Sequence, residues 1–403
     1  MHPAIRVASC VLLACALSSC AAPRALRETS PVRVGLFADL SSTGAQEGND
    51  ALKGAELRIS QANAEGGIGG RQIELIVRDM KQSAAEAVTA FTQLAQDEKV
   101  CAVIGSAVPN SALSVSPVAD MTRVPLVSLS VDDRVTNPDM KPETLQRTGP
   151  VRQFSFLVQP SATQAAATFA RYAVERFTVR RYATLYDPTN PVSLLQARAF
   201  ENAVRTSGRV VAASVTLPEG DLTAPLRALQ EAGIDAVYIC ASTEKNVAAA
   251  KAIREAIPQA VLLGNQAWYA PRSGLAGATE TAFAGAVNGA WFWMAVSPDD
   301  PGLAGIAPSF LARFGEKPRP AVVPGWDAAG LVIAAVRKAG NSSPQKVRDA
   351  LEQLTVHQAL QGPIDMDRTT HKAAFLPVAI MRIIGDAYVT VDPRFTYKPV
   401  KAP

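Results

Sequence analysis

The stretch from residue 32 to residue 79 constrains the fold more than any other part of the sequence. Apolar residues alternate with others from 32 to 38, which is typical of a β-strand. They then recur at spacings of three and four, which places them on one face of a helix, at Leu52, Ala55, Ile59 and Ala62. A glycine-rich break at 66–70 ends this helix, and residues 73–77 predict a second strand. The stretch therefore predicts a βαβ unit with parallel strands.

The same alternation continues along the 403 residues, which are enough for two domains. It predicts an α/β protein with mainly parallel sheets. In the first block we expect strands at 100–105 and 124–128, and helices after the capping box at 83–86 and around 111–121. In the second block we expect helices at 162–177, 193–206, 222–232 and 245–257, and strands at 181–186, 210–216, 236–240 and 261–264.

The last third of the chain predicts a strand at 283–296, helices at 302–314, 326–339 and 344–354, and strands at 375–384 and 388–391. Residues 132–153 interrupt the alternation with prolines and charges, so we interpret them as an extended loop. Cys101 and Cys240 each lie in an apolar, strand-like run. We interpret them as buried apolar residues; a disulfide or a reactive thiol is the alternative.

Several short motifs follow one another in a fixed order: G-A-E-L at 54–57, N-A-E-G-G-I-G-G-R at 63–71, V-I-G at 103–105, V-P-L-V-S at 124–128, L-Y-D at 185–187 and G-P-I at 362–364. In this order and spacing they resemble the leucine/isoleucine/valine-binding group of type I periplasmic binding proteins, substrate-binding proteins of branched-chain amino-acid ABC transporters. The resemblance covers nearly everything after residue 31. It implies two Rossmann-like lobes with mainly parallel sheets, joined by three crossings near 158–161, 295–298 and 357–363. The first lobe would comprise 32–158 and 298–357, and the second 159–297 and 358–395.

The first twenty residues predict export. Arg6 precedes an apolar segment at 7–17 that is too short to span a bilayer, so we interpret residues 1–19 as a signal peptide. The segment ends in L-S-S-C, which resembles a bacterial lipobox whose cysteine is Cys20.

The lipobox implies that Cys20 carries lipid and that residues 20–31 form a tether to the membrane. The alternative is an ordinary secretory signal cleaved near Ala21 or Ala22. Both interpretations predict an extracytoplasmic location in the cell envelope, facing the periplasm or the exterior.

In open parallel sheets, ligands bind at the loops that follow the carboxyl ends of the strands. These loops are 41–47, 106–111 and 128–132 in the first block, and 187–191, 241–244 and 265–268 in the second. A cleft between two lobes would bring both sets against one small molecule. The candidate ligand-binding residues are Ser106, Asn110, Ser128, Ser130, Asp132, Asn190, Ser242, Gln266, Trp268 and Trp326.

The family pattern assigns roles to some of these loops. Free N–H groups at the helix start after Gly105 would hold a ligand carboxylate, with Ser106, Asn110 or Ser111 assisting. Four positions depart from the pattern. Pro109 stands where the family has a serine on the carboxylate, Asp132 where it has a second threonine, Pro191 where it has a tyrosine, and Gln266 where it has the acid that pairs with the amino group.

These departures point away from an ordinary branched-chain amino acid. We expect Asp132 to supply the negative charge that Gln266 lacks; otherwise the ligand has no ammonium and Gln266 hydrogen-bonds a neutral or acidic group. A solvated loop charge is the alternative for Asp132. Trp268 and Trp326 would offer flat apolar walls, or else pack in the core or at the rim.

Other classes of function lack support. A net charge of +4 with no basic run disfavours nucleic-acid binding. The glycines at 66–70 follow a helix and precede a strand, which is the reverse of a nucleotide-binding loop. No G-x-S-x-G occurs, and neither His357 nor His371 has a Cys or His at metal-ligand spacing. The sequence predicts no enzyme, no cofactor and no metal.

We therefore expect an extracytoplasmic solute-binding lipoprotein. It would capture a small molecule, an amino acid or a related compound, between its lobes and deliver it to an ABC transporter permease. Its partners would be that ligand, the permease, and a membrane through the lipid anchor. The alternative function is a ligand-sensing or regulatory envelope lipoprotein of the same fold with no transport role.

Overall fold

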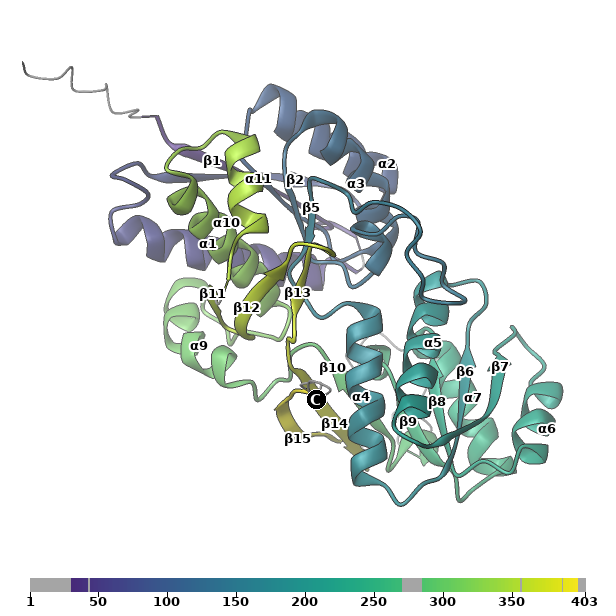
Figure 1. The fold of residues 1–403 in the computed structure, drawn as a ribbon. Coiled ribbons are helices and arrows are strands. Elements are labelled where there is room, and N and C mark those ends of the chain that lie inside the picture. Colours follow the sequence, from purple (N-terminus) through teal and green to yellow (C-terminus); the bar gives the residue numbers. More distant parts are fainter. Residues whose placement is uncertain (1–29, 43, 270–284, 356, 386, 398–403) are drawn as a thin grey trace, which may run out of the picture.

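The computed structural model describes residues 30–42, 44–269, 285–355, 357–385 and 387–397. These residues form two lobes, each built on one mainly parallel sheet with helices packed against it (Figure 1). The two-lobed α/β architecture predicted from the sequence is confirmed.

The first lobe contains an eight-stranded sheet in the order β11-β12-β13-β5-β4-β3-β1-β2. Val32 of β1 lies opposite Ile73 of β2 in parallel register, which confirms the predicted βαβ unit. The strands are β1 (Val32–Ala38), β2 (Ile73–Asp79), β3 (Val103–Gly105), β4 (Leu126–Ser128), β5 (Ser155–Leu157), β11 (His357–Ala359), β12 (Gly362–Asp367) and β13 (Lys372–Ala374). The helices of this lobe are α1 (Gln46–Ala64), α2 (Ala84–Thr92), η1 (Gln93–Asp97), α3 (Pro109–Thr122), η2 (Asp133–Val135), α9 (Pro301–Phe314), α10 (Val322–Ala339) and α11 (Pro344–Glu352).

The second lobe contains a seven-stranded sheet in the order β15-β14-β10-β9-β8-β6-β7. Its parallel strands are β6 (Arg181–Tyr186), β7 (Val210–Thr216), β8 (Ala236–Cys240), β9 (Val261–Gly264) and β10 (Trp291–Met294). Two antiparallel strands, β14 (Val378–Ile384) and β15 (Ala387–Phe395), complete the edge. The helices are α4 (Ala162–Arg176), α5 (Pro191–Thr206), α6 (Thr223–Glu231), α7 (Thr243–Ala256) and the single turn η3 (Gln266–Trp268).

Glycines allow α1 and α10 to pack closely together. A Cβ on Gly54 would lie 2.0 Å from the carbonyl oxygen of Val322, and one on Gly325 would lie 1.9 Å from that of Ala51. α10 begins at Val322 rather than at the predicted residue 326. Pro324 is tolerated there because the N–H groups of the first helical turn have no acceptor within the helix.

Three passages connect the lobes. The chain leaves the first lobe between β5 and α4, at 158–161, and returns between β10 and α9, at 295–300. The third passage is 375–377, between β13 and β14, and not 357–363 as expected. β12 pairs with β13, and Lys372 of β13 pairs with Leu157 of β5, so these strands extend the first sheet. The expected assignment of 358–374 to the second lobe is therefore wrong.

Two predicted strands prove shorter in the structure. Within the predicted strand 283–296, β10 occupies only Trp291–Met294, and residues 283–284 lie outside the described part of the chain. The predicted strand 375–384 begins at Val378. Cys101 and Cys240 are buried free thiols, which confirms the interpretation of them as core residues. Within the described ranges, no helix combines the length and the apolar character needed to cross a bilayer.

Candidate ligand-binding cleft

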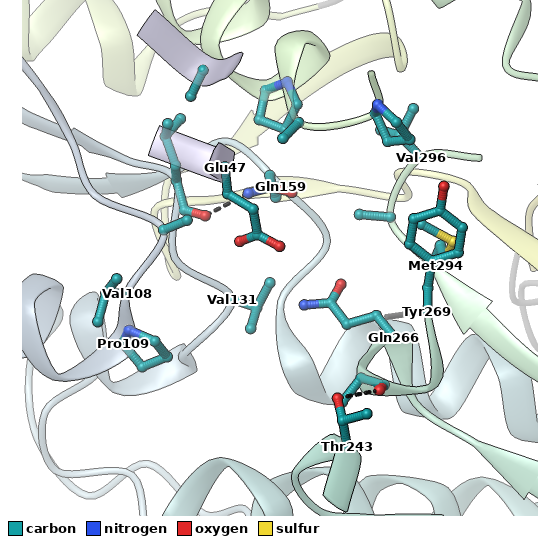
Figure 2. A pocket seen from close by; sticks show the side chains of 18 of the residues that line it. Glu47, Val108, Pro109, Val131, Gln159, Thr243, Gln266, Tyr269, Met294 and Val296 are labelled. Atoms are coloured by element: carbon teal, nitrogen blue, oxygen red, sulfur yellow. Dashed lines mark hydrogen bonds between the residues drawn. The ribbon is translucent and has the colours of Figure 1, made fainter. Parts of the chain in front are cut away.

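A cavity of about 570 Å³ lies between the two lobes. Apolar side chains make up most of its wall, and both lobes contribute to it. Figure 2 shows the Glu47 carboxylate and the Gln266 amide pointing into this space from different elements. The lining residues on the first lobe are Glu47, Ala51, Ala107, Val108, Pro109, Leu129, Val131, Pro320, Ala321 and Pro324.

The second lobe and the passages complete the wall. From α7 and η3, and from the residue that follows η3, come Thr243, Glu244, Gln266, Ala267 and Tyr269. From the first two passages and the adjoining end of β10 come Gln159, Met294, Ala295 and Val296. Most of these residues lie just after the carboxyl ends of parallel strands, where an open sheet presents loops and helix starts.

Two hydrogen bonds fix the polar part of the wall. The Gln159 side chain donates to the carbonyl oxygen of Leu129, which ties the first passage to the loop after β4. The Thr243 hydroxyl donates to the carbonyl oxygen of Ala267 over 2.7 Å, which joins α7 to η3 (Figure 2). One bond therefore holds the wall on the first-lobe side and the other holds it on the second-lobe side.

Glu47 is the acid of the first-lobe wall, in the first turn of α1. Glu47 is exposed to solvent at the open cavity, and the protein packed around its carboxylate buries it in part. This burial, followed by the negative charge of Asp50, raises the pKa of Glu47 above its ordinary value. Asp50 itself is held by Arg319, with N–O distances of 2.6 and 2.8 Å. Within the described ranges, no hydrogen bond or ion pair joins the Glu47 carboxylate to another residue.

Glu244 is the acid of the second-lobe wall, in the first turn of α7. The cation beside it in sequence is already engaged: Lys245 pairs with Asp187 at 2.8 Å and with Glu219 at 3.2 Å. Among the described residues Glu244 has no ion-pair partner of its own. Each lobe thus contributes to the cavity lining one acidic residue that has no ion-pair partner among the described residues.

Gln266 is the one predicted site residue that lines the cavity. It is half-buried on η3, and its amide makes no hydrogen bond to another described residue. Its amide oxygen and nitrogen are therefore available to a ligand.

Three of the predicted serines, Ser106, Ser128 and Ser130, are buried outside the cavity lining, and their hydroxyls bond to the backbone. Ser106 accepts from the N–H of Val108 at 2.9 Å. Ser128 and Ser130 are fully buried and accept from the backbone N–H groups two residues further on, at 3.2 and 3.1 Å. Such local bonds shape the turns that follow β3 and β4.

Asp132 does not line the cavity. Its carboxylate is fully buried and accepts two bonds from the Arg134 guanidinium, at 3.0 and 2.6 Å, and a third from the backbone N–H of Arg134. Neither the expected ligand contact nor the alternative of a solvated loop charge describes this arrangement. A neighbouring cation satisfies the carboxylate before any ligand is present.

Three other candidates lie outside the cavity wall at helix starts. Asn190 accepts from the N–H of Val192 and caps α5. Asn110 is exposed in the first turn of α3. Ser242 is the exposed N-cap of α7, one residue before the cavity-lining Thr243.

The two tryptophans follow the packing alternative and are not among the cavity-lining residues. Trp268 is almost fully buried, lies against Gly264 and donates to the carbonyl oxygen of Ile239 at 3.3 Å. Trp326 donates to the Gln61 side chain at 3.2 Å, with the Arg58 guanidinium 5.1 Å from its ring centre.

Sequence analysis does not single out Glu47, Glu244, Gln159 or Tyr269. Glu47 and Glu244 stand at the ends of two loops that the strand-end rule selects, and an acid at such a position is the signal that could have found them. The described residues contain no group of three His, Cys, Asp or Glu side chains that could hold a metal ion.

Comparisons with known proteins agree with this architecture. Leu/Ile/Val-binding protein homolog 3 of Brucella melitensis is 26% identical over 237 residues, which are 58% of this chain and 61% of that relative, less than two thirds of its length. A branched-chain amino-acid transporter substrate-binding protein, LivJ of Streptococcus pneumoniae in complex with isoleucine, is 21% identical with a TM-score of 0.67, covering 90% of this chain and 100% of that one. An ABC-transporter solute-binding protein of R. palustris in complex with benzoate is 19% identical with a TM-score of 0.66, covering 91% and 97%.

These structures share the fold with this chain. The family model described as periplasmic binding protein matches residues 31–387, nearly the whole chain. Members of this family bind solutes outside the cytoplasm and are not enzymes. The chain therefore belongs to the periplasmic binding protein family.

Proposed function

We propose that this chain is an extracytoplasmic solute-binding lipoprotein that captures a small molecule, an amino acid or a related compound, and delivers it to an ABC transporter. The observation that carries the proposal is the cavity between the lobes, whose wall comes from both lobes and from two of the passages between them. A molecule held there touches both lobes at once. Its binding energy can therefore favour closure of one lobe onto the other.

The size and chemistry of the cavity support a small ligand. A volume of about 570 Å³ lies within the usual range of small-molecule sites, about 300–1,000 Å³. Its apolar wall carries a few polar groups, which is how such sites fix the orientation of a ligand. The proteins solved with isoleucine and with benzoate support a solute of this size, and they differ enough in ligand to leave its identity to experiment.

The anchor and the transporter rest on the sequence. Cys20 and the tether at 20–31 precede β1, and Cys20 lies outside the described residues. Lipid on Cys20 would keep the binding protein close to a membrane-bound permease, which raises its local concentration there.

Binding is tested with the purified mature domain by a thermal-shift screen of amino acids, amides and amines, followed by calorimetry. A true ligand raises the unfolding temperature by mass action. The variant Gln266→Ala should then bind more weakly. Gln358→Ala, a change on the exposed face of β11, serves as the matched control and should bind as the wild type does. If no compound stabilises the protein, capture of such solutes is refuted.

Delivery is tested in cells. Deleting the gene should reduce uptake of the labelled ligand, and a plasmid copy should restore it. Tight binding with unchanged uptake would refute the transport role and favour the sensing alternative.

A further inference from the structure

The charges around the cavity are one-sided. Glu47 and Glu244 line it from opposite lobes, and its described lining residues include no lysine or arginine. Arg319 adjoins the lining residue Pro320 in the chain. Its guanidinium already donates two hydrogen bonds to the Asp50 carboxylate. A ligand entering the cavity therefore meets uncompensated negative charge.

A ligand carboxylate would need free N–H groups at a helix start, and four helices begin at this cavity: α1, α3, α7 and α10. On α1 and α7 the first turn carries the protein's own acid, Glu47 and Glu244 respectively. Each carboxylate already complements the positive end of its helix dipole. A second anion at either place would be repelled.

The start of α3 offers few donors. The N–H of Val108 is bonded to the Ser106 hydroxyl at 2.9 Å, and Pro109, the first residue of the helix, has no N–H. The next two N–H groups, those of Asn110 and Ser111, belong to residues that do not line the cavity. The start of α10 is similar. The N–H groups of Val322 and Val323 bond to backbone carbonyl oxygens at 3.0 and 3.2 Å, and Pro324 again has none.

We propose that the ligand of this cleft is an organic cation: an ammonium group on a compact apolar body, bound without any need for a carboxylate. The inference rests on the proposed function and deepens it by assigning the recognised group. Glu47 and Glu244 would accept hydrogen bonds from the ammonium, and the Gln266 side-chain oxygen is a third acceptor. The Tyr269 ring, which also lines the cavity, adds an electron-rich face of the kind that attracts ammonium groups.

The raised pKa of Glu47 agrees with this assignment. Burial and the nearby charge of Asp50 make ionisation of Glu47 costly. A cation next to the carboxylate would favour its ionised form. The apolar residues of the wall would enclose the body of the ligand.

The test compares matched compounds that share one apolar body. For the isobutyl series the probes are L-leucine, L-leucinamide, 3-methylbutylamine and 4-methylpentanoate. The same four forms are taken for the benzyl and methyl bodies. Calorimetry at low and moderate salt measures each affinity. We expect the amine and the amide of at least one series to bind no more weakly than the amino acid, and the carboxylate not to bind.

Variants of the mature protein identify the groups responsible. Glu47→Gln and Glu244→Gln should each weaken binding of the preferred amine about tenfold or more, the effect of losing a hydrogen bond between charged groups. Glu56→Gln, on α1 but away from the cavity, and Glu255→Gln, exposed in the last turn of α7, are the matched controls and should leave the affinity unchanged. Circular dichroism checks that all four variants are folded.

The outcomes separate this inference from the proposed function. If an amino acid binds and its amine and amide bind far more weakly, the ligand carboxylate is required; the inference is then overturned and solute capture stands. The same holds if the carboxylates bind best, or if Glu47→Gln and Glu244→Gln bind the amine as the wild type does. If no compound of any series binds, solute capture of this kind fails together with the inference.

Discussion

Asp327 should make the stability of this protein depend on pH in the neutral range. Its carboxylate lies fully buried on α10 and accepts the N–H of Leu360 at 2.6 Å and two bonds from Gln361, both at 3.1 Å. Burial raises the pKa of Asp327 from 3.8 to about 7, against the opposing effect of these three hydrogen bonds. The negative charge of Asp300 makes a smaller contribution to this raised value.

The sign follows from linkage. In the unfolded chain the carboxyl ionises at about its ordinary pKa, whereas in the folded protein it stays protonated to a higher pH. Stability from this group is therefore fully present below pH 3.8 and is lost as the pH rises toward 7. The gap between 3.8 and about 7 corresponds to about 4 kcal/mol in the free energy of unfolding. The raised pKa is the net result of burial and the opposing hydrogen bonds. We therefore expect a measured change in the free energy of unfolding of about 2–4 kcal/mol.

The variant Asp327→Asn removes the ionisation and keeps the shape of the side chain. Denaturant unfolding of ligand-free wild type and variant at several pH values between 5 and 8 isolates the contribution of Asp327, since other titrating groups cancel in the difference. Relative to the wild type, the variant should gain stability from pH 5 to about pH 7, and the difference should then level off. Asp97→Asn, an exposed change at the end of η1, serves as the control and should show a constant difference.

A difference between wild type and Asp327→Asn that does not change with pH would refute the reasoning. It would mean that the three donors outweigh burial and keep Asp327 ionised throughout.

Further predictions concern the fold, the anchor and the motion. Asp132→Asn breaks the buried pair with Arg134 and should lower the free energy of unfolding by about 1–3 kcal/mol without changing ligand affinity; weaker binding at unchanged stability would return Asp132 to the site. Trp268→Ala should cost about 3–5 kcal/mol, because it empties a packed position in the second-lobe core; a loss well below that would contradict the packing role. Wild-type protein should partition with membranes and Cys20→Ala should not, and an unmodified N-terminus at Ala21 or beyond would exclude the lipid anchor. Small-angle scattering should show a smaller radius of gyration with saturating ligand, and an unchanged radius would contradict lobe closure.

The parts of the fold that the sequence predicts are those that local patterns specify. The helix predicted at 162–177 ends within a residue of the observed end of α4, and the alternation from Val32 predicts β1 and its parallel partner. β13 shows where this approach stops. It is three residues long and joins the first sheet through one pairing, Lys372 with Leu157, between positions far apart in the chain. No local periodicity in the sequence indicates such a contact. The third passage could be placed only by resemblance to the family, and that placement is wrong.

The candidate site also has a part that the sequence predicts, its loops, and a part that it does not, the side chains that line the cavity. The strand-end rule selected the loops that contain Pro109, Leu129, Glu244 and Gln266, since topology alone decides which loops face the cleft. It could not select side chains, because a polar side chain in a loop has nearby competitors for its hydrogen bonds. The Ser106 hydroxyl is taken by a backbone N–H two residues on, and other predicted serines behave likewise. The residues left for a ligand are those without a local partner, which only the structure identifies.

The placement of one carboxylate on each lobe has a consequence for closure. If closure brings Glu47 and Glu244 within a few Å of each other, both lose water and their like charges repel by about 1–4 kcal/mol across the range of dielectric that a cleft spans. An ammonium between them would turn this repulsion into attraction, so the proposed cation would supply both the contacts and the condition for closing. A neutral solute of the same shape could cover the apolar wall equally well. It would leave two carboxylates to lose water without a partner, which is costly. The arrangement that attracts a cation therefore also rejects its neutral isostere.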